Sequence, residues 1–119
     1  MAAILFISLI IGGCTHHANR TGLTVDIGQP VHYTSGDGDT FTARYGSLSD
    51  GSLHFVKVKM PDGREYTLPQ VVSASGVRYT DEQEVVWWTH QGKVLVQTRG
   101  SAGSWQQNYP ELRKFSGTN

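Results

Sequence analysis

Apolar and polar residues alternate with a period of two along most of the chain between residues 40 and 97. This alternation is typical of strands with one buried face, and each run has the length of a strand. No stretch shows the 3.6-residue period of an amphipathic helix. The pattern therefore predicts an all-β fold. The predicted strands cover residues 40–45, 56–60, 65–68, 85–89 and 93–97.

Turn-forming residues separate these runs. Clusters rich in Gly, Ser and Asp occupy residues 35–39 and 47–52. Met60-Pro61-Asp62-Gly63 has the sequence of a type I turn followed by a residue with positive φ, and His90-Gln91-Gly92 is predicted to join its strands in the same way. We expect a meander of short antiparallel strands. Closing it into a small β-barrel would leave the fewest exposed strand edges.

The segment after Gly100 permits two interpretations. Trp105, Tyr109, Leu112 and Phe115 are large enough to pack back onto the domain. They could belong to a last strand, or residues 110–114 could begin a short helix.

Composition narrows the classes of function. The 119 residues include ten basic and ten acidic side chains, so the chain is formally neutral and carries no basic excess for nucleic-acid binding. His16-His17 and Asp37-x-Asp39 are too sparse for a metal site, and no cofactor is expected. No pattern of Ser, His and Asp indicates a catalytic triad. We therefore expect a binding protein rather than an enzyme.

The N-terminal segment resembles the leader of a bacterial lipoprotein. Residues 2–11 are apolar but too few to span a bilayer, and Ile11-Gly12-Gly13-Cys14 resembles a lipobox with the only cysteine of the chain. With Cys14 lipidated, no thiol remains for a disulfide or a metal. The resulting division is a signal peptide (1–13), a lipidated cysteine with a flexible tether (14–29) and a β-barrel domain (30–119). Thr15 after the cysteine favours the outer membrane of a Gram-negative bacterium, with the domain facing the periplasm.

The segment Val71 to Tyr79 is unlike a plain strand. Small side chains at residues 73–76 allow a narrow, protruding loop, and Gly76 can adopt backbone angles that other residues avoid. Tyr79 could brace this loop from behind. Trp88, on the following strand, is expected to support the core or the loop.

With these residues the chain resembles the MliC/PliC family, whose members are membrane-bound or periplasmic inhibitors of c-type lysozyme. Ser75, Gly76 and Tyr79 match its Ser-Gly-x-x-Tyr motif, and Trp87-Trp88-Thr89 resembles its second, aromatic-rich motif. The resemblance covers residues 31–99. It implies a small antiparallel barrel whose Ser75 loop enters the lysozyme cleft, where the serine hydroxyl binds one catalytic carboxyl group. A lysine of the second motif would pair with the other carboxyl group.

The chain departs from the family pattern at the cation. His90 stands where the family has lysine, and Lys93 follows three residues later. If His90 has this role, its pairing with a carboxylate should strengthen as the pH falls through about 6.5, because only imidazolium is charged. Otherwise Lys93 reaches the site. The candidate lysozyme-binding residues are Ser75, Gly76, Arg78, Tyr79, Thr89, His90 and Lys93.

Two further points follow from the resemblance. Family members commonly have a disulfide, and here Ser35 stands where a cysteine is expected. Asp81, Glu82 and Glu84 would place negative charge beside the loop and attract a basic lysozyme.

The alternative function is an envelope β-domain that scaffolds another protein or binds a glycan without inhibiting lysozyme. The oligomeric state stays open.

Overall fold

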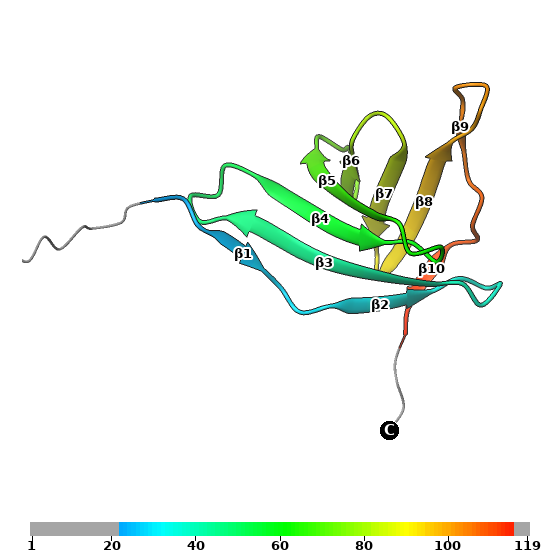
Figure 1. Cartoon of the computed structure of the whole chain (residues 1–119), viewed down its shortest axis with the longest axis horizontal. Helices are drawn as coiled ribbons and strands as arrows, with labels where there is room; N and C mark the ends of the chain where they lie inside the picture. The colour runs from blue at the N-terminus through cyan, green and yellow to red at the C-terminus, as the bar shows by residue number, and fades with distance from the viewer. Residues whose placement is uncertain (1–21, 116–119) are drawn as a thin grey trace, which may run out of the picture.

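The computed structural model describes residues 22–115, which form ten β-strands and no helix (Figure 1). Nothing in that part of the chain is a helix long and apolar enough to cross a membrane. The strands are β1 (Val25–Ile27), β2 (Val31–Thr34), β3 (Thr40–Leu48), β4 (His54–Lys59), β5 (Glu65–Val71), β6 (Val77–Thr80), β7 (Val85–His90), β8 (Lys93–Arg99), β9 (Trp105–Gln106) and β10 (Leu112–Lys114). Cys14 lies outside the described residues.

Eight antiparallel strands close into a barrel, so the predicted all-β barrel of meandering strands is confirmed. Consecutive strands from β2 to β8 pair with each other, and β10 closes the barrel between β8 and β2. Of the two interpretations of the C-terminal segment, the strand is the one observed. Leu112 aligns with Val94 of β8, and Arg113 aligns with Thr34 of β2.

The interior of the barrel is built from the alternate residues that the period-two pattern had placed on one face. Trp87 of β7 lies in the centre, with the ring of Tyr33 edge-on at 5.4 Å and the ring of Phe41 tilted at 6.1 Å. Burying one such side chain contributes about 1.5–3 kcal/mol to folding. The other buried residues of the predicted inward faces are Ala43, Val56, Val58, Met60, Leu68, Val85, Val94 and Val96.

Two of the turns can be compared directly with their predictions. Gly63 has a φ of 89°, and its N–H donates to the Met60 carbonyl at 3.0 Å, as expected for that turn. The prediction for the turn after His90 was wrong in type. Gln91 and Gly92 both have positive φ, 51° and 76°, which makes a two-residue type I′ turn. This turn matches the twist of its two strands, whereas a type I turn would splay them.

One end of the sheet projects beyond the barrel. Residues 25–27, which fell within the expected tether, form β1 and pair with residues 46–48 of β3. Structured chain therefore begins upstream of residue 30. We call residues 23–27 and 46–55 the arm; Figure 1 shows it extending away from β5–β8, on the side where the chain enters.

Candidate functional site

The segment between β5 and β6, residues 72–76, forms a loop whose tip is fixed by hydrogen bonds to one carbonyl group. The Ser73 hydroxyl donates to the Ser75 carbonyl oxygen at 2.6 Å. The indole N–H of Trp88 donates to the same oxygen at 2.9 Å. These two bonds orient the Ser75 peptide group, so the loop is held from its own chain and from the neighbouring strand β7.

Gly76 is the residue that lets the loop lie against β7. Its φ of 62° is in the left-handed region, which side-chain-bearing residues avoid. A Cβ atom at this position would overlap the Thr89 carbonyl oxygen and press on the Trp88 indole. The glycine of the motif is therefore required both by backbone conformation and by space.

Ser75 itself is exposed at the loop tip. Its carbonyl group is occupied, but its hydroxyl group makes no hydrogen bond within residues 22–115. Next to it is a surface hollow of about 280 Å³. Ser75, Trp88, His90, Lys93, Leu95 and Glu111 line this hollow. The tip therefore combines a free hydroxyl group with a neighbouring concave surface.

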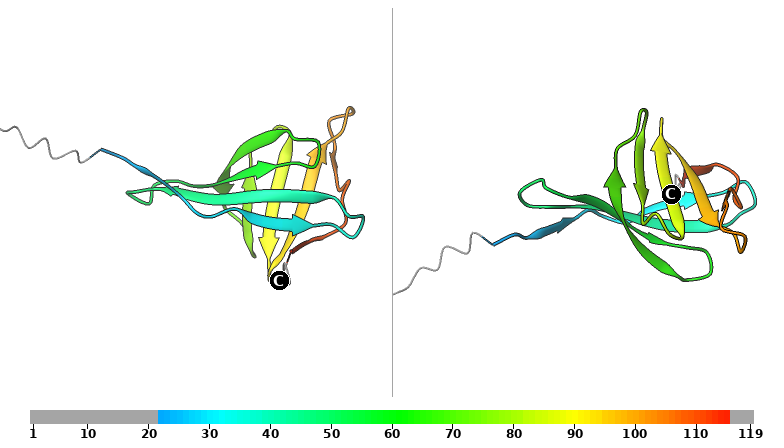
Figure 2. Two further views of the ribbon diagram at one scale, coloured as in Figure 1. Left: turned by 60° about the horizontal axis from the view of Figure 1, so that its bottom comes forward. Right: turned by 90° about the horizontal axis from the view of Figure 1, so that it is seen from above.

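The hairpin between β7 and β8 brings both candidate cations to this hollow. His90 and Lys93 face each other as the last cross-strand pair before the turn. The Lys93 ammonium group lies 3.2 Å from a Glu111 carboxylate oxygen, and both side chains are about half exposed. In the right-hand view of Figure 2, the loop and this hairpin protrude side by side at the same end of their strands.

The remaining candidates lie behind the tip. Tyr79 is 8% exposed and packs in the core beside the Tyr45 ring, at 5.8 Å. The Thr89 hydroxyl donates to the Val77 carbonyl at 3.3 Å, across the β6–β7 pair. Arg78 points outward and pairs with Glu82 at 3.5 Å. Tyr79 and Thr89 thus have supporting positions, and Arg78 is the outward-facing member of this group.

The acidic turn is not where the sequence suggested. Residues 81–84 connect the ends of β6 and β7 opposite the 72–76 loop, so their charge does not lie beside Ser75. Asp81 has a local structural role. Burial tends to raise the pKa of this carboxyl group, but hydrogen bonds from three backbone N–H groups outweigh that effect and lower it.

Ser73 and Glu111 are among the residues of the site that sequence reasoning missed. The sequence indicated Ser73 only as one of the small residues of the loop. A serine hydroxyl group can, however, bond the backbone of the residue two positions later, as Ser73 does with Ser75. Glu111 gave no signal, because its contact with Lys93 depends on β10 closing the barrel. Ser35, which replaces an expected cysteine, is buried; its hydroxyl oxygen accepts the N–H groups of Asp37 and Asp39, both at 3.3 Å.

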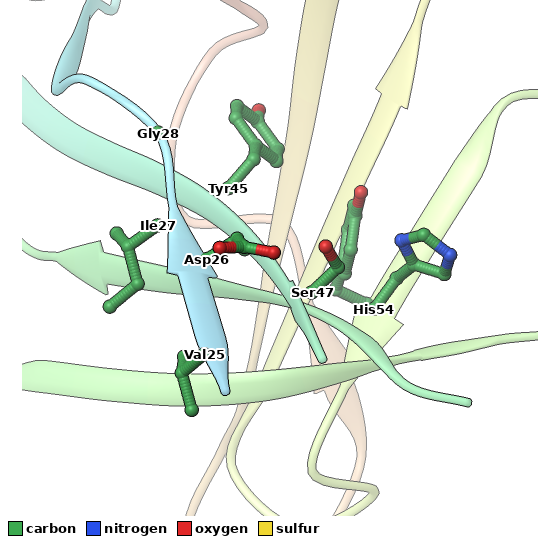
Figure 3. Close-up of a pocket in the computed structure, with 9 residues that line it drawn as sticks. Val25, Asp26, Ile27, Gly28, Tyr45, Ser47 and His54 are labelled. Carbon is green, nitrogen blue, oxygen red and sulfur yellow. The ribbon is translucent and has the colours of Figure 1, made fainter. Parts of the chain in front are cut away.

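A larger hollow, of about 670 Å³, lies in the arm (Figure 3). Asp26, Ser47 and His54 are direct neighbours there across β1, β3 and β4. No hydrogen bond within the described chain joins these three side chains. Among residues 22–115, the hollow included, no group of three or more His, Cys, Asp or Glu side chains could hold a metal ion.

Comparison with known proteins gives two matches. Residues 33–105 match the model of the family MliC, described as membrane-bound lysozyme-inhibitor of c-type lysozyme. Among solved structures, the fold is similar to that of Pseudomonas aeruginosa MliC in complex with hen egg white lysozyme. The TM-score is 0.58 and the identity 21%, over 97% of this chain and 99% of that one. The comparison with curated proteins finds no match.

Proposed function

Because the chain belongs to the MliC family of membrane-bound inhibitors of c-type lysozyme, we propose that it inhibits such a lysozyme by inserting the 72–76 loop into the active-site cleft. The Ser75 hydroxyl would bind one catalytic carboxyl group. A cation of the 90–93 hairpin would bind the other. Lysozyme needs both groups, one as general acid and one as nucleophile, so occupying them stops hydrolysis without any chemistry by the inhibitor.

The observation that carries this proposal is the fixed Ser75 carbonyl group. Two hydrogen bonds, from Ser73 and Trp88, hold the tip while leaving the hydroxyl group free. A loop that is already ordered loses little conformational entropy on binding, and this improves affinity. A solved relative of the same fold was crystallised with hen egg white lysozyme, which supports a c-type lysozyme as the partner.

For the cation we favour Lys93 over His90. Both line the hollow beside Ser75, but lysine is charged at every physiological pH, whereas histidine is charged only below about pH 6.5. Lys93 pairs with Glu111, yet an ion pair of half-exposed side chains contributes at most about 1 kcal/mol. Lys93 could therefore leave Glu111 and pair with a lysozyme carboxylate at a small cost in free energy.

We further propose that Cys14 carries the membrane anchor. The family description is membrane-bound, and a lipidated cysteine after the apolar segment 2–11 supplies such an attachment. Several acyl chains on one cysteine hold a protein stably, where a single chain is marginal. The domain would then lie in the periplasm of a Gram-negative bacterium, attached to the outer membrane, where host lysozyme arrives.

The proposal is tested by lysis of a bacterial cell suspension with hen egg white lysozyme, with the protein titrated in at pH 6 and pH 8. We expect inhibition at both values. Ser75→Asp should abolish it, because the two catalytic carboxyl groups of lysozyme would repel the introduced carboxylate. Ser101→Asp, on the exposed turn after β8, is the matched control and should inhibit as the natural protein does.

The outcome separates the loop mechanism from the alternative function. Full inhibition by Ser75→Asp would exclude insertion of this loop. A folded natural protein that fails to inhibit at either pH would instead favour the envelope scaffold, and a pull-down from envelope extract would then seek its partner.

A further inference from the structure

The outer face of β3 and β4 carries a row of basic side chains. Arg44 and Lys57 are direct cross-strand neighbours. Lys59 follows on the same face of β4 but aligns with the acidic Glu65 of β5, so the row proper is Arg44 and Lys57. Like charges placed directly opposite each other destabilise a sheet. Within residues 22–115 neither Arg44 nor Lys57 pairs with a carboxylate; they donate instead to the Gly28 carbonyl at 3.1 Å and the Thr67 hydroxyl at 3.0 Å. This row is therefore suited to an anionic ligand.

The same outer face becomes apolar toward the arm. Ile27 of β1 aligns with Gly46 of β3 and, beyond it, with Phe55 of β4. Val25 aligns with Leu48 in the next row. In Figure 3, Val25 and Ile27 point away from the polar side chains that line the hollow on the other face of the arm. The arm thus has one polar face and one apolar face.

Phe55 on β4 is buried, but three apolar side chains at the start of the arm are exposed. The exposed fractions are 62% for Leu23, 56% for Val25 and 39% for Ile27. Among the strands of residues 22–115, β1 pairs only with β3, and its other edge has no partner there. A single exposed apolar side chain needs no explanation. Three at alternate positions, on an edge strand and just before it, indicate a surface that another phase or molecule covers.

The chain itself indicates what covers this face. β1 is where the chain arrives from Cys14, and Gly22 lies eight residues after that cysteine (22 − 14 = 8). Eight residues span at most about 28 Å. A lipid on Cys14, which is part of the function proposed above, would therefore keep Gly22, where the arm begins, within about 28 Å of the bilayer.

We propose that the outer face of the arm and its basic row dock on the lipid headgroup surface. Leu23, Val25 and Ile27 enter the headgroup region, and Arg44 and Lys57 bind lipid phosphates. Apolar side chains flanked by basic ones are the combination that binds anionic membrane surfaces. The anchor keeps the local lipid concentration high, so this contact can be weak and still set the orientation of the domain.

The docked orientation presents the inhibitory loop to the periplasm. The outer face of β3 and β4 is opposite the barrel interior that Phe41, Ala43, Val56 and Val58 line. In the right-hand view of Figure 2, β5–β8 rise from the layer of β2–β4, and the 72–76 loop lies at their far end. A domain resting on its β3–β4 face would therefore hold Ser75 away from the membrane.

The test uses the lipidated protein in vesicles of phosphatidylethanolamine and phosphatidylglycerol that contain a headgroup-attached quencher. A lipidated Cys14 has its sulfur in a thioether, so Val25→Cys supplies a unique thiol for a fluorophore. Val72→Cys is the matched control, because Val72 is 99% exposed at the base of the inhibitory loop. We expect strong quenching at residue 25 and none at residue 72.

Charge reversal and lipid composition test the basic row. Adding Arg44→Glu and Lys57→Glu to the Val25→Cys protein should reduce the quenching at residue 25 to the level at residue 72. Vesicles made of phosphatidylcholine alone, which has no net charge, should reduce it to the same level. Arg44→Gln with Lys57→Gln is the milder pair should reversal prevent folding, and circular dichroism checks the fold of each. Equal quenching at residues 25 and 72 would overturn the proposal. The proposal would also be overturned if the emission at residue 25 depended on the amount of protein per vesicle and not on the quencher. A second copy of the chain would then cover the arm.

Lysozyme inhibition by vesicles that carry the Val25→Cys protein, whose label lies outside the 72–76 loop, keeps the two proposals apart. Inhibition together with equal quenching would overturn docking and leave the inhibitory function standing. Unequal quenching without inhibition would support docking and contradict the inhibitory function. A protein that fails to remain on the vesicles would overturn docking, because the short connection to the anchor is its premise.

Discussion

The indole N–H of Trp88 and the carbonyl oxygen of Ser75, thirteen residues apart in the chain, are joined by a hydrogen bond of 2.9 Å. The bond links the strand β7 to the tip of the loop that carries the serine. Trp88 is only partly buried, so its contribution is to the position of the loop more than to the core.

Trp88→Phe should weaken lysozyme inhibition while leaving most of the stability intact. Phenylalanine keeps an aromatic ring but cannot donate to the Ser75 carbonyl. A hydrogen bond of this kind contributes about 1 kcal/mol net, which corresponds to roughly a fivefold weaker inhibition constant. The measurement is inhibition of lysozyme by titration, with thermal unfolding as a check on the fold.

Trp105→Phe is the matched control for this prediction. Trp105 is also partly buried, but it lies on β9 beneath the Arg99 guanidinium group, away from the loop. Its replacement should leave inhibition unchanged. Equal weakening by the two variants would show that the Trp88 bond does not position the loop.

Gly76→Ala should abolish inhibition and destabilise the fold more than Gly38→Ala does. Both glycines have positive φ, so both replacements cost roughly 1–2 kcal/mol of backbone strain. At Gly38 nothing lies within 4 Å of the new Cβ atom, whereas at Gly76 it would overlap the Thr89 carbonyl oxygen. The free energy of unfolding from urea titration gives the difference between the two variants, and a Gly76→Ala protein as stable as Gly38→Ala would contradict the close approach.

Much of the barrel could be predicted because its signal is local. Alternation in 40–45 and 93–97 predicted strands with one buried face, and Phe41, Val94 and Val96 of these strands are buried. The resemblance placed the loop at Ser75 and Gly76, where the structure has a protruding turn with positive φ at the glycine.

The parts that could not be predicted depend on contacts far apart in the chain. β1 has three residues and exists because it pairs with the end of β3, and its short alternation carries too little signal by itself. Glu111 meets Lys93 only because β10 closes the barrel. The acidic turn was predicted to lie beside the loop because residues 81–84 are close to residues 72–76 in the sequence. The strand β6 between them carries the chain to the opposite end of the barrel.

The fold should lose stability as the pH rises above about 10. Burial raises the pKa of Tyr33, Tyr45 and Tyr79 above the ordinary value of 10.0, because the charged phenolate is poorly solvated inside the barrel. The unfolded chain releases these protons near pH 10, while the folded chain keeps them. Their contribution is therefore fully present below pH 10 and is lost above it.

Urea unfolding across this pH range, followed with the ultraviolet absorbance of tyrosinate, measures the effect. Tyr45→Phe removes one ionising group and leaves the Trp87 N–H without the oxygen that accepts it at 3.1 Å. This variant should be less stable at pH 7 by about 1–3 kcal/mol, yet lose less stability above pH 10. An unchanged pH profile would contradict the role of the buried hydroxyl groups.

Glu111→Gln should tighten inhibition at pH 8. The Lys93 ammonium group lies 3.2 Å from the Glu111 carboxylate, which competes with the lysozyme carboxyl groups and repels them. Releasing an exposed pair costs at most about 1 kcal/mol, so the gain should reach up to roughly fivefold.

Lys93→Gln should weaken inhibition at both pH 6 and pH 8, whereas His90→Gln should weaken it at pH 6 alone if imidazolium contributes. Inhibition that survives Lys93→Gln but disappears between pH 6 and pH 8 would assign the cation to His90.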